Sequence, residues 1–123
     1  MDVLIVEDEW LIAEELKDQL EDLGHNPIGP ALNCSAALEL LREVKPDVAI
    51  LDTELGDETC EVVLHRCVAD GIPVIIGSGH DQSHLPAFVG DRILLSKPYS
   101  TSAIVGALAA AVGSVRRGSA GRD

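Results

Sequence analysis

Basic residues are scarce in this chain of 123 residues. Nine Lys and Arg stand against 21 Asp and Glu, which gives a formal net charge of −12. The phosphate backbone of a nucleic acid binds clusters of basic side chains and repels a surface of this sign. Anionic lipid repels it in the same way. The composition therefore argues against nucleic-acid and membrane partners, although a local group of acids could still hold a divalent cation.

Cysteine is also rare, and the three residues are Cys34, Cys60 and Cys67. Their number is odd, and neither a CxxC pair nor a zinc-type Cys/His spacing occurs. A disulfide framework or a zinc site is therefore not expected. We expect reduced thiols that pack as small hydrophobic side chains.

Long hydrophobic runs are absent as well. The apolar run at residues 3–6 is too short for the core of a secretory signal. The longest apolar stretch, residues 103–113, is too short to cross a bilayer. The sequence therefore predicts a soluble, cytoplasmic protein, and its length and 46% hydrophobic content fit one globular domain.

Short apolar runs alternate with segments of helical periodicity. The expected strands are residues 3–6, 27–32, 47–52, 73–77 and 92–96. The expected helices are residues 9–24, 35–44, 60–70 and 101–115, with at most a short helix within 80–89. This alternation predicts a doubly wound α/β fold, in which helices cover both faces of a five-stranded parallel sheet. Two prolines favour an edge position for the second strand, and Asn33 or Ser35 could cap the second helix.

Polar side chains follow the four strongly apolar strands. Glu7 and Asp8 come after the first, Asp52 ends the third, Ser78 follows the fourth and Lys97 follows the fifth. Ligands of open α/β sheets bind beyond the carboxyl ends of the strands. Carboxylates brought together there repel one another unless a cation lies among them, and oxygen ligands favour Mg²⁺. Lys97 and Ser78 could then hold a phosphoryl group accepted by Asp52.

Taken one at a time, these residues have simpler explanations. The acids after the first strand could stabilise the N-terminus of the next helix. Asp52 could be a turn residue, Ser78 a loop hydroxyl and Lys97 a solvated charge. Their coincidence at four strand ends is what favours a phosphoryl-accepting metal site.

Four segments carry a resemblance to a known family: VLIVEDE (3–9), PDVAILDTEL (46–55), IPVIIGSG (72–79) and LLSKPY (94–99). In this order they resemble the receiver domain of response regulators in two-component signalling. The resemblance covers roughly residues 1–115 and implies a flavodoxin-like (βα)5 sheet with strand order 2-1-3-4-5. We expect a receiver domain over residues 1–116, followed by a short flexible tail at 117–123 and no output domain.

By this resemblance Asp52 is the phosphoacceptor, Lys97 pairs with the phosphoryl group and Ser78 is the switch hydroxyl. The resemblance also implies four Mg²⁺ ligands: Glu7 (mainly through water), Asp8, Asp52 and the backbone carbonyl of Glu54. The Lys97–Pro98 peptide bond is expected to be cis, an isomer that X-Pro bonds adopt most readily.

Some positions depart from the common family pattern. Leu94 stands where the family often has the aromatic residue of its switch. Gly79, the loop LGDETC (55–60) and the sequence KPY resemble a receiver subgroup of alphaproteobacteria. Tyr99 then becomes a candidate for signal-dependent packing, with ordinary core packing as the alternative. His80 and Glu54 either tune hydrolysis of the acyl phosphate or are plain surface residues.

The resemblance implies a stand-alone response regulator that takes a phosphoryl group from a sensor histidine kinase. It would signal through a downstream protein partner or drain phosphoryl groups as a sink. The protein is not expected to be an enzyme, beyond at most an autophosphatase activity that hydrolyses its own phosphoryl group. One candidate assembly is a homodimer through the helix 4–strand 5–helix 5 face. The alternatives are a Mg²⁺-dependent phosphohydrolase with an aspartyl-phosphate intermediate and a degenerate receiver that only binds partners.

Overall fold

A five-stranded parallel sheet forms the centre of the computed structural model, which describes residues 1–79 and 85–120. Its strands are β1 (Asp2–Val6), β2 (Asn26–Ala31), β3 (Val48–Asp52), β6 (Val74–Ser78) and β7 (Ile93–Ser96). They lie in the order β2-β1-β3-β6-β7. Because β4 and β5 belong to a separate hairpin, this is the expected order 2-1-3-4-5. The edge position of the proline-containing strand β2 is confirmed too.

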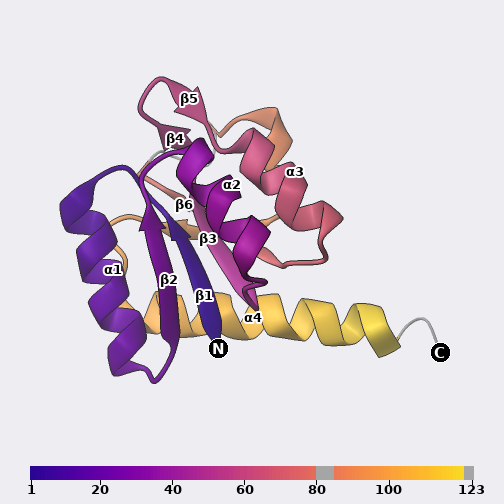
Figure 1. Ribbon diagram of the computed structural model, residues 1–123. Coiled ribbons are helices and arrows are strands. Elements are labelled where there is room, and N and C mark those ends of the chain that lie inside the picture. The colour runs from indigo at the N-terminus through magenta and orange to yellow at the C-terminus, as the bar shows by residue number, and fades with distance from the viewer. Residues whose placement is uncertain (80–84, 121–123) are drawn as a thin grey trace.

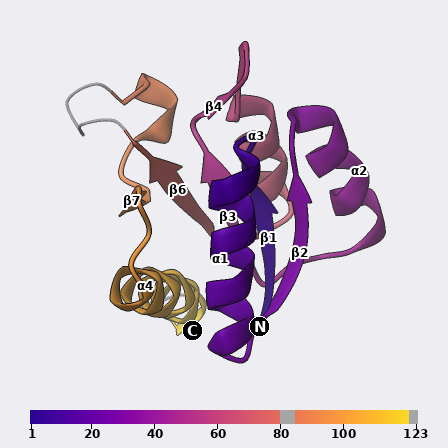
Figure 2. The same ribbon diagram turned by 90° about the vertical axis from the view of Figure 1, so that its left-hand side faces the viewer.

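Helices cover both faces of this sheet (Figure 1). They are α1 (Trp10–Asp22), α2 (Cys34–Glu43), α3 (Glu61–Ala69) and α4 (Thr101–Ala120). In the turned view of Figure 2, α1 stands in front of the strands, with α2 and α4 on opposite sides of it. Within residues 1–79 and 85–120, no helix is both long and apolar enough to span a bilayer.

The core has two halves, one on each face of the sheet. Leu4 and Val6 of β1 belong to the half that packs against α2 and α3. Val3 and Ile5 point the opposite way and belong to the half that packs against α1 and α4. Successive side chains of a strand alternate between faces, so a strand covered on both faces is apolar throughout. This explains the unbroken apolar runs of the sequence.

The start of α2 agrees with the sequence prediction, whereas the end of α4 does not. Asn33 caps α2, because its side chain accepts a hydrogen bond from the backbone N–H of Ala36 at 2.8 Å. The last helix, however, runs from Thr101 to Ala120, five residues further than expected. Residues 117–120 are therefore helical, which corrects the expectation of a tail there. In Figure 1 the C-terminal part of α4 projects past the strands of the sheet.

The loop after Asp52 also differs from expectation. It forms a small antiparallel hairpin from β4 (Glu54–Leu55) and β5 (Glu58–Thr59). Between β6 and β7, a short 3-10 helix spans Ala87–Val89. The remainder of the short helix anticipated within 80–89 falls largely outside the described residues.

Candidate functional site

Three carboxylates meet at the carboxyl edge of the sheet. Val6 of β1 is in register with Leu51 of β3, so the next residues along, Glu7 and Asp52, lie side by side. With Asp8, these groups place one carboxylate oxygen each within 4.8 Å of one another. Glu7 and Asp52 are buried, whereas Asp8 is exposed. The structure thus brings together the acids that the sequence placed after two different strands.

Lys97 lies between two of these acids. Its Nζ is 2.7 Å from Glu7 Oε1 and 3.0 Å from Asp52 Oδ2, and its side chain is only 11% exposed. The backbone N–H of Lys97 donates to the carbonyl of Ser78 at 3.0 Å, which joins the ends of β7 and β6. The Lys97–Pro98 bond is cis as expected, and a second cis bond, Gly29–Pro30, was not anticipated.

Ser78 and Glu54 also lie at this edge. Gly77 is in register with Asp52, so Ser78 is one residue beyond that row, and it is buried. The backbone N–H of Glu54 donates to Asp52 Oδ1 at 3.4 Å. A hollow of about 350 Å³ opens beside the acids. It is lined by Asp8, Glu9, Asp52, Glu54, Gly56, Gly79 and Lys97.

Burial and neighbouring charges shift the pKa values of Glu7 and Lys97. Burial raises the pKa of Glu7 to about 7, Lys97 opposes that rise and Asp52 adds to it. Burial on its own would lower the pKa of Lys97, but Glu7 and Asp52 outweigh it, so the pKa of Lys97 is raised. The ammonium therefore keeps its charge between the two acids.

The donor set fits a divalent cation. Carboxylate oxygens are hard ligands of the kind that Mg²⁺ prefers, and Mg²⁺ needs only one or two of them from the protein. Lys97 offsets part of the negative charge of the three close acids, and the exposed Asp8 lines the hollow. Asp8 Oδ2 accepts a hydrogen bond from the backbone N–H of Gly56 at 2.9 Å. An added cation would relieve the repulsion that remains among the acids.

The β4–β5 hairpin supplies contacts that the sequence analysis missed. Gly56 sits in its turn with a φ of +68°, a conformation that favours glycine, and contacts Asp8. Glu58 Oε1 accepts a hydrogen bond from the backbone N–H of Cys34 at 2.9 Å, at the N-terminus of α2. The dipeptide Gly56–Asp57 between extended residues was the available signal for such a hairpin.

The positions singled out for switching have different environments. Leu94 is half-buried on β7 and packs on the α2–α3 half of the core. Tyr99 is 7% exposed and belongs to the opposite half, among residues of α1 and α4. His80 lies outside the described residues.

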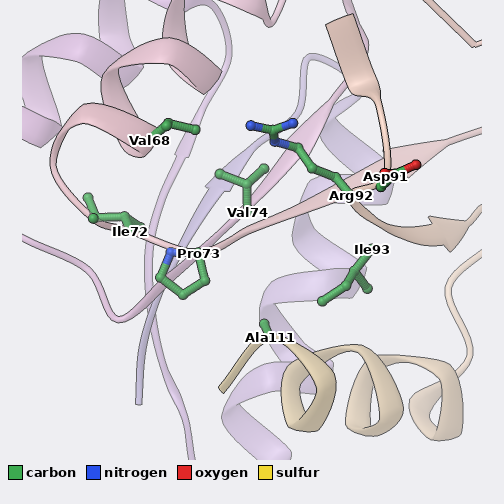
Figure 3. Close-up of a pocket in the computed structure, with 9 residues that line it drawn as sticks. Val68, Ile72, Pro73, Val74, Asp91, Arg92, Ile93 and Ala111 are labelled. Carbon is green, nitrogen blue, oxygen red and sulfur yellow. The ribbon is translucent and has the colours of Figure 1, made fainter. Parts of the chain in front are cut away.

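A second hollow, of about 390 Å³, lies at the other end of the sheet (Figure 3). Apolar residues and the charged pair Asp91 and Arg92 line it, and the full set is Val68, Gly71, Ile72, Pro73, Val74, Asp91, Arg92, Ile93 and Ala111. It adjoins the residues where β6 and β7 begin, whereas the carboxylates lie where strands end. None of the predicted site residues lines it, so it is separate from the acidic site.

Residues 3–109 match the family model described as the response regulator receiver domain. The chain belongs to this family. Among curated relatives, the transcriptional regulatory protein PdtaR of Mycobacterium tuberculosis is 30% identical over 118 residues. The match covers 93% of this receiver chain and 58% of PdtaR, so the chain spans less than two thirds of that relative's length.

Solved structures agree with the family. SdrG from Sphingomonas melonis Fr1 is 35% identical with a TM-score of 0.82, over 91% of this receiver and 96% of that chain. SdrG has also been solved in a BeF3-activated conformation, with a TM-score of 0.78, over 89% of this receiver and 93% of that chain. The receiver domain of PhyR from Erythrobacter litoralis is 28% identical, with a TM-score of 0.77, over 90% and 88% of the two chains.

Proposed function

We propose that this receiver accepts a phosphoryl group on Asp52 from the phosphohistidine of a sensor histidine kinase, in a reaction that needs Mg²⁺. The observation that carries the proposal is the position of Lys97, whose ammonium contacts both Glu7 and Asp52. A solvated lysine or a simple helix cap would not account for a buried cation between acids from two strands. The BeF3-activated structure of SdrG, a relative with 35% identity, supports the same chemistry here.

Transfer would proceed by attack of an Asp52 carboxylate oxygen on phosphorus. The new P–O bond forms while the P–N bond to the kinase histidine breaks, and the released imidazole takes a proton from solvent. Glu7, Asp8, Asp52 and the backbone carbonyl of Glu54 would hold Mg²⁺. Bound Mg²⁺ would offset the negative charge of the acids and of the incoming phosphoryl oxygens.

Lys97 and Ser78 would hold the transferred group. Lys97 Nζ already lies 3.0 Å from Asp52 Oδ2, so it is placed to neutralise an oxygen of a group attached there. Ser78 is the last residue of β6, one step past the row that contains Asp52, and its hydroxyl would donate to a second oxygen. Both donors come from strand ends, which are rigid supports for such a site.

The output of this receiver would be a contact with another protein, or removal of phosphoryl groups from the kinase. We propose residues 1–116 as the receiver unit, a cytoplasmic location and autophosphatase activity as its only hydrolytic reaction. A homodimer through the face that includes β7 and α4 is the assembly we would test. The net charge of −12 supports a protein partner over nucleic acid.

Turnover separates this proposal from a phosphohydrolase. With an excess of acetyl phosphate and MgCl₂, a receiver should gain one phosphoryl group per chain, and p-nitrophenyl phosphate should not be hydrolysed repeatedly. The Asp57→Asn variant, changed at an exposed turn carboxylate, is the matched control for Asp52→Asn. Many turnovers of p-nitrophenyl phosphate per chain that vanish in Asp52→Asn would contradict the proposal and favour the enzyme.

A further inference from the structure

Gly77 occupies a position whose backbone does not require glycine. It lies in β6, between Ile76 and Ser78, and it is not among the glycines with a positive φ. The requirement comes from a side chain instead. A Cβ built on Gly77 would collide with the hydroxyl of Tyr99 and lie 3.0 Å from its Cζ. The phenol therefore occupies the space that any larger residue 77 would need.

Core packing and a backbone hydrogen bond hold Tyr99 in this position against Gly77. Its side chain is buried in the half of the core that packs against α1 and α4. Its backbone carbonyl accepts a hydrogen bond from Gln19 Nε2 of α1 at 2.9 Å. Burial raises the pKa of Tyr99, and the charges of Glu7 and Asp52 add to that rise, so the phenol lies within the field of the acidic site.

The chain connects this contact to the groups that would hold the phosphoryl group. Gly77 directly precedes Ser78 and is in register with Asp52, while Tyr99 is two residues after Lys97. The backbone hydrogen bond from Lys97 to Ser78 already joins the two strand ends at 3.0 Å. The phenol on Gly77 is a second link between the same two ends.

We propose that Gly77 and Tyr99 form a steric pair that positions Lys97 and Ser78 for phosphoryl transfer, an inference that rests on the proposed function. Tyr99 acts through its neighbours in the chain and touches no reacting atom. With the phenol seated on Gly77, the segment from Lys97 to Tyr99 is held against the end of β6. A methyl group at residue 77 would lift the phenol and displace the ammonium from Asp52.

The structure contains space into which the phenol ring of Tyr99 could move if it were displaced from Gly77. A hollow of about 350 Å³ lies beside Tyr99, between α1 and the segment that follows β7. Its lining includes Ile12, Gln19, Pro98 and Tyr99 itself. The ring could move into this space without entering the packed core, so we expect the Gly77→Ala variant to fold with the site altered.

The test is a double-mutant cycle on the rate of phosphoryl gain from acetyl phosphate with MgCl₂, followed by intact mass. Gly77→Ala should label roughly tenfold more slowly than wild type, because misplacing a reacting group costs rate steeply. In the Tyr99→Phe background the same change should cost much less, because the hydroxyl that collides is gone and the ring carbon at 3.0 Å need move by only a few tenths of an ångström. Gly106→Ala, where an added Cβ meets nothing within 4 Å, is the control and should label like wild type.

Melting curves of all variants would show that each is folded. Normal labelling of Gly77→Ala would overturn this inference alone, and so would a double variant as slow as Gly77→Ala. Absence of label on wild type would instead overturn the proposed function, and the inference with it. Recovery in the double variant would support the steric pair, since a general structural role of Gly77 would not be rescued at Tyr99.

Discussion

The ammonium of Lys97 lies between the two buried carboxylates of Glu7 and Asp52. We expect its positive charge to stabilise the folded protein against the repulsion between these acids. Replacement by Met removes the charge but keeps most of the side-chain length, leaving Glu7 and Asp52 without the cation at 2.7 and 3.0 Å. We expect the free energy of unfolding at neutral pH to fall by roughly 3 kcal/mol, as for other broken buried pairs. Urea titration measures this change.

Magnesium should restore part of that loss, because a divalent cation can offset the same carboxylates. Lys45→Met, which removes an exposed lysine, is the matched control and should change stability little. A Lys97→Met protein as stable as wild type without Mg²⁺ would contradict the view that this ammonium holds the acids together.

The thiols give a pH dependence whose sign follows from burial. Burial is the largest cause that raises the pKa of Cys60 and of Cys67 to about 12, from an ordinary value of 9.0. The unfolded chain therefore releases these protons above pH 9 while the folded chain keeps them. Their contribution to stability is present below pH 9 and is lost as pH rises, by up to about 1.4 kcal/mol per pH unit for each thiol.

Urea titrations of wild type and of the Cys60→Ala/Cys67→Ala variant on both sides of pH 9 test this. The wild type should lose stability more steeply above pH 9 than the variant, whatever the two proteins' difference at neutral pH. Parallel curves would show that the thiols ionise equally in both states.

Among the elements, the β4–β5 hairpin has a structural role beyond connecting β3 to α3. Glu58 on β5 accepts a hydrogen bond from the backbone N–H of Cys34, at the start of α2. Such a carboxylate satisfies a free donor and suits the positive end of the helix. Glu58→Ala should lower the free energy of unfolding by about 1 kcal/mol, the usual cost of a lost cap.

Glu58→Gln keeps an acceptor oxygen and should retain much of this stability. Asp57→Ala, in the same hairpin, is the control for changes in the turn itself. Equal stability of Glu58→Ala and wild type in thermal melts would mean that the hairpin does not support α2.

The elements also show what the sequence could and could not predict. Strands such as residues 47–52 were predictable, because a strand buried on both faces must be apolar throughout. That Glu7 and Asp52 share one edge of the sheet followed from the rule that ligands bind at the carboxyl ends of parallel strands. That their two strands are neighbours came instead from the strand order implied by the resemblance to receiver domains. The bond from Glu58 to Cys34 was not predictable, because it joins residues 24 positions apart that only the fold brings together.

The same limit applies to Gly77 and Tyr99. In the sequence, Gly77 is only a glycine within a strand and Tyr99 only an aromatic residue at the start of a helix. The structure shows that the missing side chain of Gly77 leaves the space that the Tyr99 phenol occupies. The extension of α4 to Ala120 was missed for a different reason. Propensity alone gives weak boundaries, and a polar, glycine-containing sequence does not exclude another helical turn.

For the whole molecule, the net charge of −12 predicts that any added cation will raise the stability of the fold. The cluster of Glu7, Asp8 and Asp52 predicts a larger effect for Mg²⁺. Any ligand that binds only the folded chain raises its stability by mass action. Millimolar MgCl₂ should raise the melting temperature by more than NaCl at equal ionic strength. A gain of 1 kcal/mol corresponds to about 4 °C for a domain of this size.

Asp8→Asn should remove most of the Mg²⁺-specific part of that rise, whereas Asp57→Asn, which makes the same charge change on the exposed turn, should keep it. An equal response of both variants would show that Mg²⁺ only screens the overall charge.

The central claim is that Asp52 accepts a phosphoryl group, and intact mass after exposure to acetyl phosphate tests it most directly. We predict that wild type and Asp57→Asn gain one phosphoryl group when MgCl₂ is present and none when it is chelated, and that Asp52→Asn gains none. A label on Asp52→Asn equal to that on wild type would contradict the account, as would a wild type that neither gains the group nor releases phosphate through Asp52.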